Sequence, residues 1–223
     1  KTKHKNLEFV KKSILNNITA DIKGSDAVFH FAALLGVENS DKKPLDTLKI
    51  DLEGSVNVFK SAMEANIKRM IFSSSSEVYG EPSELPIRED STKGPVSTYG
   101  VSKLAAEMYA KAYNQEFGTD IRIVRFFNVY GPRQAANFVV PIFVNLALKN
   151  NSIKIFGEGN QTRCFTYVED VADAVLKVFE KGKAGEAYNI GNNQPTTIFE
   201  LAQIVKELTG SKSQITKLGF GKE

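Results

Sequence analysis

The 223-residue sequence contains a single cysteine, Cys164, and only two histidines, His4 and His30. One cysteine excludes an internal disulfide framework and is typical of a reducing compartment. No cysteine and histidine cluster has the spacing of a metal site, so we expect no metal. The sequence also lacks a signal-peptide pattern and an apolar run long enough to span a bilayer. These absences predict a soluble, cytoplasmic protein that is not bound to membranes.

The charges are nearly balanced, with 29 Lys and Arg residues against 26 Asp and Glu residues and a formal net charge of +3. This charge is small for the length and does not indicate nucleic-acid binding, although a local basic pocket for phosphate remains compatible with it. The hydrophobic share of 42% and the charged share of 25% are ordinary for a globular protein. The length is sufficient for one large domain or two small ones.

A glycine motif is also missing. A dinucleotide-binding sheet normally opens with a strand, a glycine-rich turn and a helix, followed by an acidic residue for the ribose. No Gly-x-x-Gly-x-x-Gly pattern occurs in the sequence. We therefore expect this chain to be the middle of a longer protein.

Strand-like apolar segments alternate with amphipathic helical segments, which predicts an α/β fold with a parallel sheet covered by helices. The expected strands are 7–10, 26–33, 69–72, 121–127, 153–156 and 187–190. The expected helices are 44–65, 97–117, 139–148, 168–181 and 197–208. The stretch 81–95 contains three prolines and is expected to be a surface loop.

Tyr99 and Lys103 lie four residues apart, shortly after the serine run 73–76. Residues at this spacing project from one face of a helix. There an ammonium group can favour the phenolate of a tyrosine, whose pKa is normally about 10. A hydroxyl side chain from a strand end can then orient an alcohol whose proton the tyrosine takes. The spacing fits equally well an aromatic side chain packed inward beside a solvated lysine.

Several longer motifs surround this pair in a fixed order. They are 30–33 (HFAA), 73–80 (SSSSEVYG), 125–133 (RFFNVYGPR), 157–170 (GEGNQTRCFTYVED) and 188–191 (YNIG). With them, the chain from about Val28 to Gly210 resembles the extended short-chain dehydrogenase/reductase family of nucleotide-sugar enzymes, the NAD-dependent epimerases and dehydratases. The most similar group is that of the UDP-glucose 4-epimerases.

The resemblance implies a Rossmann-type doubly wound parallel sheet that binds NAD and a smaller C-terminal part that binds the substrate. It places a partial NAD-binding domain, without the first strand and the Gly-rich loop, at 1–132. A partial substrate-binding region, interleaved with returning Rossmann strands, is expected at 133–223. The family also pairs two subunits through the helices that correspond to 48–65 and 104–117, which implies a homodimer.

The resemblance assigns roles to individual residues. Ser75 takes the position of the catalytic serine or threonine, with Tyr99 as the acid/base and Lys103 as its partner. The implied cofactor-binding residues are Phe31, Ala32, Ala33, Leu35, Ser73, Ser74, Tyr99, Lys103 and Phe127. The implied substrate-binding residues are Ser75, Glu77, Asn128, Ile155, Phe156 and Arg163. Arg163 suits a diphosphate because a planar guanidinium gives bidentate bonds to phosphate.

The implied reaction interconverts UDP-glucose and UDP-galactose, or their N-acetyl forms, through a transient 4-keto sugar and bound NAD. Glu77 complicates this assignment, because related 4,6-dehydratases and UDP-glucuronate decarboxylases also carry a glutamate there. The dehydratases place an aspartate just before it, where this chain has Ser76, and the decarboxylases carry a longer insertion before the tyrosine. A 4-epimerase of galactose metabolism is therefore favoured, while a decarboxylase, a dehydratase and a non-catalytic nucleotide-binding relative stay open.

Two departures from the family pattern affect the cofactor. Ser13-Ile14 stands where Asp-Ile is usual beside the adenine, and Ile50-Asp51 stands where an asparagine near the cofactor is common. Each departure either weakens NAD binding or reflects a divergent branch. The intact set of Ser75, Tyr99 and Lys103 favours an enzyme over a pure binding protein, which has no chemical need for it.

Overall fold

The computed structural model describes residues 5–34 and 42–219, and the chain divides into two compact units. The first unit comprises Lys1–Phe126 and Ala174–Asn189, and the second comprises Phe127–Asp173 and Ile190–Glu223. Each unit has its own hydrophobic core. The domain limits expected from the sequence, at 132 and 133, stay a prediction.

The first unit is built on a four-stranded sheet. Its strands, in spatial order, are β1 (Ala27–His30), β2 (Arg69–Ser75), β3 (Ile121–Phe126) and β8 (Ala187–Ile190). β1 and β3 both run parallel to β2, with Phe29 opposite Ile71 and Phe72 opposite Ile123. Parallel strands need crossover connections, and here helices supply them. The predicted α/β fold with a parallel sheet is confirmed.

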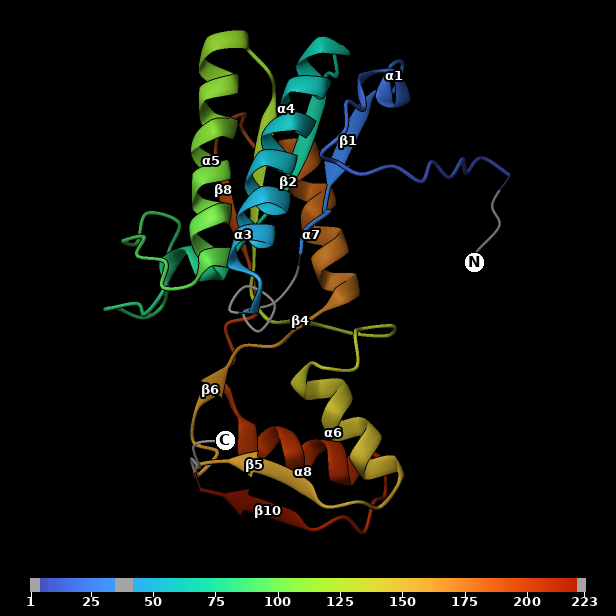
Figure 1. Ribbon diagram of the computed structural model, residues 1–223. Coiled ribbons are helices and arrows are strands. Elements are labelled where there is room, and N and C mark those ends of the chain that lie inside the picture. Colours follow the sequence, from blue (N-terminus) through green and yellow to red (C-terminus); the bar gives the residue numbers. More distant parts are fainter. Residues whose placement is uncertain (1–4, 35–41, 220–223) are drawn as a thin grey trace. The chain divides into compact units, whose positions relative to one another are not determined.

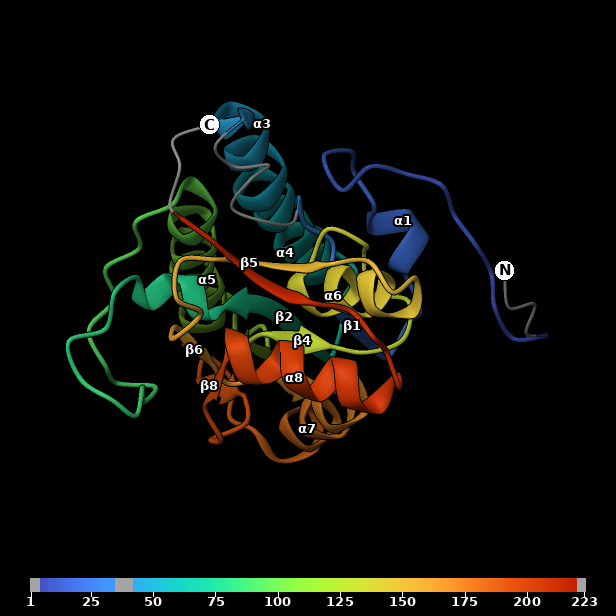
Figure 2. The ribbon, with the colours of Figure 1, turned by 90° about the horizontal axis from the view of Figure 1, so that it is seen from below.

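Helices cover both faces of this sheet. The helical segments of the first unit are α1 (Thr19–Ile22), α3 (Pro44–Thr47), the π-helix η1 (Leu48–Glu53), α4 (Gly54–Glu64), the 3₁₀-helix η2 (Ser76–Tyr79), α5 (Thr98–Phe117) and the part of α7 (Val168–Lys181) from Ala174 onward. α4 and α5 lie side by side on one face (Figure 1). Figure 2 shows α7 on the opposite side of β2.

The core of the first unit lies between α4, α5 and the sheet. It consists of Val58, Phe59, Ala62, Ile67, Met70, Phe72, Ala106, Ala110, Ile121 and Ile123. The two alanines are one turn apart on α5, so a stripe of small side chains faces the sheet. The ring of Phe59 meets that of Phe72 edge-on, with centroids 5.2 Å apart. This packing holds α5 against β2, the two elements that carry Tyr99 and Ser75.

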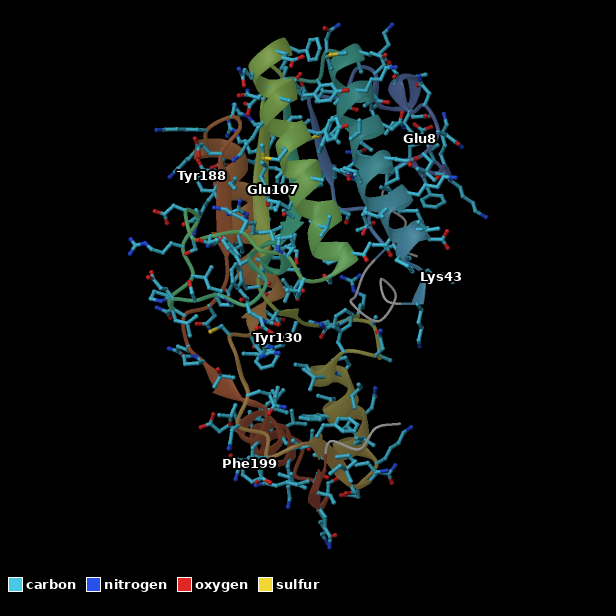
Figure 3. The ribbon with its side chains drawn as sticks, turned by 60° about the vertical axis from the view of Figure 1, so that its left-hand side comes forward. Glu8, Lys43, Glu107, Tyr130, Tyr188 and Phe199 are labelled. Atoms are coloured by element: carbon cyan, nitrogen blue, oxygen red, sulfur yellow. The ribbon has the colours of Figure 1, made fainter. Side chains whose placement is uncertain are left out.

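The second unit contains two helices and short strands. They are β4 (Val129–Tyr130), α6 (Val139–Leu148), β5 (Ile153–Phe156), β6 (Thr162–Arg163), β7 (Thr166–Tyr167), β9 (Thr196–Thr197), α8 (Ile198–Leu208) and β10 (Ile215–Leu218). β5 runs parallel to β10, and its residues alternate between buried and exposed. A reciprocal capping box between Thr197 and Glu200 starts α8. Figure 3 labels Tyr130 and Phe199 in this unit.

Most of the expected elements are confirmed, but two expectations need correction. The strand expected at 7–10 is wrong: this segment pairs with no strand in the described part of the chain, and Phe9 is 80% exposed. The helix expected at 44–65 is interrupted by the π-helical turn η1. The two-residue strands and β10 were not expected, because segments so short show no periodicity.

Two further features concern a membrane span and a metal site. Within residues 5–34 and 42–219, no helix combines the length and apolar character that a membrane span requires. The same residues contain no group of three or more His, Cys, Asp or Glu side chains that could hold a metal ion. Cys164 is half-buried and carries a free thiol.

Candidate functional site

Tyr99 and Lys103 occupy the first two turns of α5. The helix starts at a capped residue, Ser97, whose backbone is extended and whose Oγ accepts a hydrogen bond from the Gly100 amide at 3.0 Å. Both side chains point into the protein, and Lys103 is only 1% exposed. The structure therefore excludes the interpretation of Lys103 as a solvated surface lysine.

Contacts with β2 fix the position of Lys103. Its Nζ donates a hydrogen bond to the Ser73 carbonyl oxygen at 2.9 Å. It also lies 5.2 Å from the ring centroid of Phe72 and 5.7 Å from that of Tyr99, within range of cation–π attraction. Burial lowers the pKa of Lys103 to about 8, against the opposing effect of the Asp51 charge.

Ser75 stands at the C-terminal end of β2. Its Oγ accepts a hydrogen bond from the Glu77 amide at 3.2 Å and caps the short helix η2. A hydroxyl group has one proton, and this bond does not use it. The proton of Ser75 is thus available to the Tyr99 oxygen, and the hydrogen bond between the two side chains acts to lower the pKa of Tyr99.

The pKa of Tyr99 is nevertheless raised to about 12, first by burial and then by the charges of Asp51 and Glu77. The sequence suggested that Lys103 would favour the phenolate, but in this structure burial and the charges of Asp51 and Glu77 determine the direction of the Tyr99 pKa shift. Tyr99 is therefore a phenol at neutral pH. An added positive charge at the site would shift it toward the phenolate.

Glu77 lies close to Tyr99 because α5 approaches η2 closely. A side chain at Gly100 would place its Cβ 2.6 Å from the Glu77 carbonyl oxygen, so only glycine permits this approach. Glu77 itself is half-buried, and its charge raises the pKa of Tyr99. A carboxylate on η2 therefore acts through its charge on the candidate acid/base.

A buried aspartate and histidine complete this group. Asp51 lies on η1, and its Oδ1 accepts a hydrogen bond from the Leu34 amide at 2.6 Å. Ser55 donates its proton to the Asp51 carbonyl oxygen at 2.5 Å, so the 3.0 Å contact between His30 Nε2 and Ser55 Oγ must be donated by the imidazole. Burial, followed by the charge of Lys103, lowers the pKa of His30 to about 3 and keeps it neutral.

We name two polar groups along α5. The Tyr99 cluster comprises His30, Asp51, Ser75, Tyr99 and Lys103. The Glu107 cluster comprises Ser74, Tyr79, Glu107, Arg125 and Asn189. Glu107 lies midway along α5 (Figure 3), two turns after Tyr99 on the same face.

The sequence analysis missed the Glu107 cluster. Glu107 accepts two bonds from Arg125, at 2.9 and 2.6 Å, and a third from Ser74 at 2.5 Å. Arg125 also donates to the Tyr79 hydroxyl at 2.6 Å, and Tyr79 donates to Asn189 at 2.7 Å. The signal was an arginine inside an apolar strand, since a charge in such a position needs a buried partner.

The other expected cofactor residues of the first unit lie at two strand ends. Phe31 and Ala32 are exposed just after β1, and Ala33 is half-buried. The Ser73 carbonyl oxygen accepts a hydrogen bond from Lys103, whereas the Ser74 hydroxyl donates a hydrogen bond to Glu107. Leu35 lies outside the described residues.

The expected substrate residues Asn128, Ile155, Phe156 and Arg163, and the expected cofactor residue Phe127, belong to the second unit. Asn128 is exposed with a φ of 38°, and Arg163 is exposed on β6. On β5, Phe156 is 61% exposed, whereas the side chain of Ile155 lies in the core, so that only its backbone could reach a ligand. Phe127 is half-buried.

Residues 2–191 match the model of the NAD dependent epimerase/dehydratase family. The chain belongs to this family. The first unit presents the expected sheet with helices on both faces. The expected family and fold class are thereby confirmed.

Curated relatives carry different activities. The chain is 35% identical to a UDP-N-acetyl-alpha-D-glucosaminuronate decarboxylase of Bacillus cytotoxicus, covering 97% of this chain and 70% of the relative. It is 39% identical to a putative UDP-glucose 4-epimerase of Methanocaldococcus jannaschii, covering 87% of this chain and 64% of the relative. The chain thus spans about two thirds of these relatives. The family is that of nucleotide-sugar epimerases, dehydratases and decarboxylases.

A solved structure agrees with this family. The UDP-N-acetylglucosamine 4-epimerase of Methanobrevibacter ruminantium, in complex with UDP-N-acetylmuramic acid, superposes with a TM-score of 0.93 at 33% identity. The match covers 97% of this chain and 71% of that protein.

Proposed function

We propose that the full-length protein is an NAD-dependent UDP-sugar 4-epimerase that interconverts UDP-glucose and UDP-galactose or their N-acetyl forms. The observation that carries this proposal is the convergence of Ser75, Tyr99 and Lys103 from two elements. The proton of Ser75 is available to Tyr99, and Lys103 is buried beside the tyrosine ring. A tyrosine in this setting suits proton transfer with a sugar hydroxyl.

Each residue of the set has its own task. Tyr99 as phenolate takes the proton from the 4-hydroxyl of the sugar and later returns it to the same oxygen, after the C4 hydrogen has been delivered to the opposite face of C4. Ser75 donates its hydroxyl proton to the Tyr99 oxygen in this structure, and it would share this hydrogen bond with the reacting oxygen and so orient it. The Lys103 ammonium, held by the Ser73 carbonyl group, stabilises the negative charge on Tyr99. NAD, when bound, supplies the acceptor for the C4 hydrogen and gives it back, so the reaction has no net oxidation.

The residues present fit such a cofactor. The buried Oδ2 of Asp51 has no hydrogen-bond partner among the described residues, and a hydroxyl group of the cofactor would satisfy it. The exposed Phe31 and Ala32 offer an apolar surface and an accessible backbone at the end of β1. Lys103 would bind the ribose, as the family resemblance implies.

The second unit would hold the UDP part of the substrate. Phe156 presents an exposed aromatic ring against which a base can stack. Arg163 presents a guanidinium for the diphosphate, and Asn128 presents an exposed amide. A UDP-sugar derivative occupies the related 4-epimerase structure, which supports this class of substrate.

A second candidate function is decarboxylation of a UDP-uronic acid. Glu77 favours it, because a carboxylate beside Tyr99 could act beyond C4 of the sugar. The Bacillus cytotoxicus relative also supports it. Dehydration is less compatible, since Ser76 stands where an acid would be needed to expel the C6 hydroxyl.

Product analysis of the full-length protein distinguishes these functions. The protein would be supplied with NAD and, separately, with UDP-glucose, UDP-N-acetylglucosamine and UDP-glucuronate. A 4-epimerase forms the corresponding 4-epimer of at least one of them and releases no carbon dioxide. Carbon dioxide with a UDP-pentose from UDP-glucuronate would establish the decarboxylase instead.

We also propose that two copies pair through α4 and α5 in a homodimer. α5 exposes the large apolar side chains of Met108 and Tyr109, with Met108 60% exposed. Light scattering would test this proposal, with Met108→Glu expected to favour the monomer. A monomeric wild-type protein at micromolar concentration would contradict it.

A further inference from the structure

The carboxyl group of Asp51 is buried, and within the described residues only one of its two oxygens accepts a hydrogen bond. The residue is 0% exposed, and its Oδ1 accepts the bond from the Leu34 amide. Its Oδ2 is one of two buried side-chain oxygen or nitrogen atoms that find no partner within the described part of the chain. A buried carboxylate without full hydrogen bonding is costly, so its retention calls for a functional reason.

The backbone that carries Asp51 is also unusual. Residues 48–53 form a π-helical turn, in which the Gly54 amide bonds back to the Lys49 carbonyl oxygen. Such turns are rare, and they occur frequently at functional sites. η1 packs directly against α5, the helix that carries Tyr99 and Lys103. The π-helical turn therefore presents the carboxylate from an element next to that pair.

Asp51 and Lys103 form no ion pair, yet their charges act on each other. The Asp51 carboxylate raises the pKa of Lys103 and also that of Tyr99. Burial raises the pKa of Asp51 itself, whereas the Leu34 amide and the charge of Lys103 oppose that change. Because these groups are shielded from water, charge effects between them are stronger than at the surface.

Among the described residues, few charged groups act on Tyr99, Lys103 or Asp51. They are Asp51 on η1, Glu77 on η2 and Lys103 on α5. Lys103 in turn acts on His30 of β1, which is neutral. The remaining charged residues of α3 and η1 are exposed, and they are Asp46, Lys49 and Glu53. Solvent screens charges in such positions. Asp51 is thus the buried negative charge of the Tyr99 cluster.

We infer that Asp51 is a positioning residue of the proposed epimerase: its buried carboxylate keeps Lys103 charged and Tyr99 protonated, and so sets the pH range in which the pair works. This inference rests on the proposed roles of Tyr99 and Lys103. Asp51 is also one of the two positions at which the sequence departs from the family pattern.

Asp51→Asn provides the test, because asparagine keeps the oxygen that accepts the Leu34 bond, while it removes the charge and replaces Oδ2 by an amide group. The matched control is Glu53→Gln, which removes an exposed carboxylate from the same turn. Nuclear magnetic resonance of labelled lysine side chains, recorded across a range of pH, measures the titration of Lys103. This measurement does not require turnover. Asp51→Ser, which also removes the charge, serves as a second variant if Asp51→Asn folds poorly.

We expect Asp51→Asn to move the Lys103 titration from about 8 to lower pH by about one unit. Both limbs of the pH profile of kcat/KM should move to lower pH by a similar amount. Glu53→Gln should leave both readouts unchanged. Equal Lys103 titration in Asp51→Asn and wild type overturns the inference, whether or not the protein proves to be an epimerase. Absence of turnover with a shifted titration would instead count against the proposed function alone.

Discussion

The Tyr99 cluster and the Glu107 cluster lie two turns apart on one face of α5, yet they are built differently. In the Glu107 cluster, every buried polar side-chain atom has a partner, and Glu107 and Arg125 form a doubly bonded ion pair. In the Tyr99 cluster, Asp51 Oδ2 has no hydrogen-bond partner among the described residues, and the pKa values of His30 and Lys103 are lowered. A fully satisfied polar network fixes a structure, whereas an incompletely satisfied one marks a place for a ligand or a reaction.

The largest effect is expected from Tyr99→Phe. Loss of the acid/base should lower turnover of the UDP-sugar by about 100- to 10,000-fold. The free energy of unfolding should change by only about 1 kcal/mol, since the change removes a single hydroxyl group. Turnover assays and denaturant unfolding measure the two quantities.

Tyr109→Phe is the matched control, because it removes the same hydroxyl group from an exposed position on the same helix. It should leave both turnover and stability near the wild-type values. Equal activity of Tyr99→Phe and Tyr109→Phe would show that Tyr99 is not the acid/base of the reaction.

Glu107→Gln should produce the opposite pattern. It leaves the Arg125 charge buried without its partner, which typically costs about 3–5 kcal/mol of stability. Asp26→Asn, which breaks the exposed ion pair with Lys68, should cost less than about 1 kcal/mol. Denaturant unfolding of the three proteins measures the difference. A loss for Glu107→Gln as small as that for Asp26→Asn would show that the cluster does not hold the fold.

Much of this architecture follows from the sequence. The regular spacing of apolar residues predicts β2, β3 and α5 within a few residues, because each has one long buried face or a continuous apolar run. The motif order also predicts which side chains of β2 and α5 meet. These features depend on local patterns that a single segment carries.

What the sequence does not predict depends on contacts between distant segments. Glu107 and Arg125 meet because α5 packs on β3, and no local pattern joins them. The π-helical turn at Asp51 arises from a one-residue slip in hydrogen bonding, which residue types in a helical pattern do not reveal. The raised pKa of Tyr99 similarly reflects burial, which the spacing of Tyr99 and Lys103 alone does not give.

His30 should make the Tyr99 cluster sensitive to acid. Its pKa falls from the ordinary 6.5 to about 3 in the folded chain, so the unfolded chain binds the proton first as pH decreases. Its contribution to stability is therefore complete above pH 6.5 and is lost progressively as pH falls toward 3. At pH 5 the loss amounts to roughly 2 kcal/mol.

His30→Gln keeps a donor for Ser55 without the titration and should flatten this part of the stability profile. Denaturant unfolding at pH 7, 6 and 5 would compare the two proteins. Parallel profiles for wild type and His30→Gln would mean that the buried imidazole is not held neutral.

Glu77→Gln should have the smallest effect. In a 4-epimerase the carboxylate takes no part in the reaction, so turnover should stay within about tenfold of wild type, with a small shift of the acid limb to lower pH as the Tyr99 pKa decreases. Initial rates across pH measure both changes. A loss as large as that of Tyr99→Phe would instead place Glu77 in the reaction and favour the decarboxylase.

The most direct test of the central claim follows the hydrogen at C4. UDP-glucose carrying deuterium at C4 would be incubated with the full-length protein and NAD, and the product would be examined by nuclear magnetic resonance. A 4-epimerase in which Tyr99 moves only the hydroxyl proton should give UDP-galactose that retains the deuterium at C4, and Tyr99→Phe should give almost none of this product. UDP-galactose without the deuterium, or wild-type turnover by Tyr99→Phe, would contradict the account.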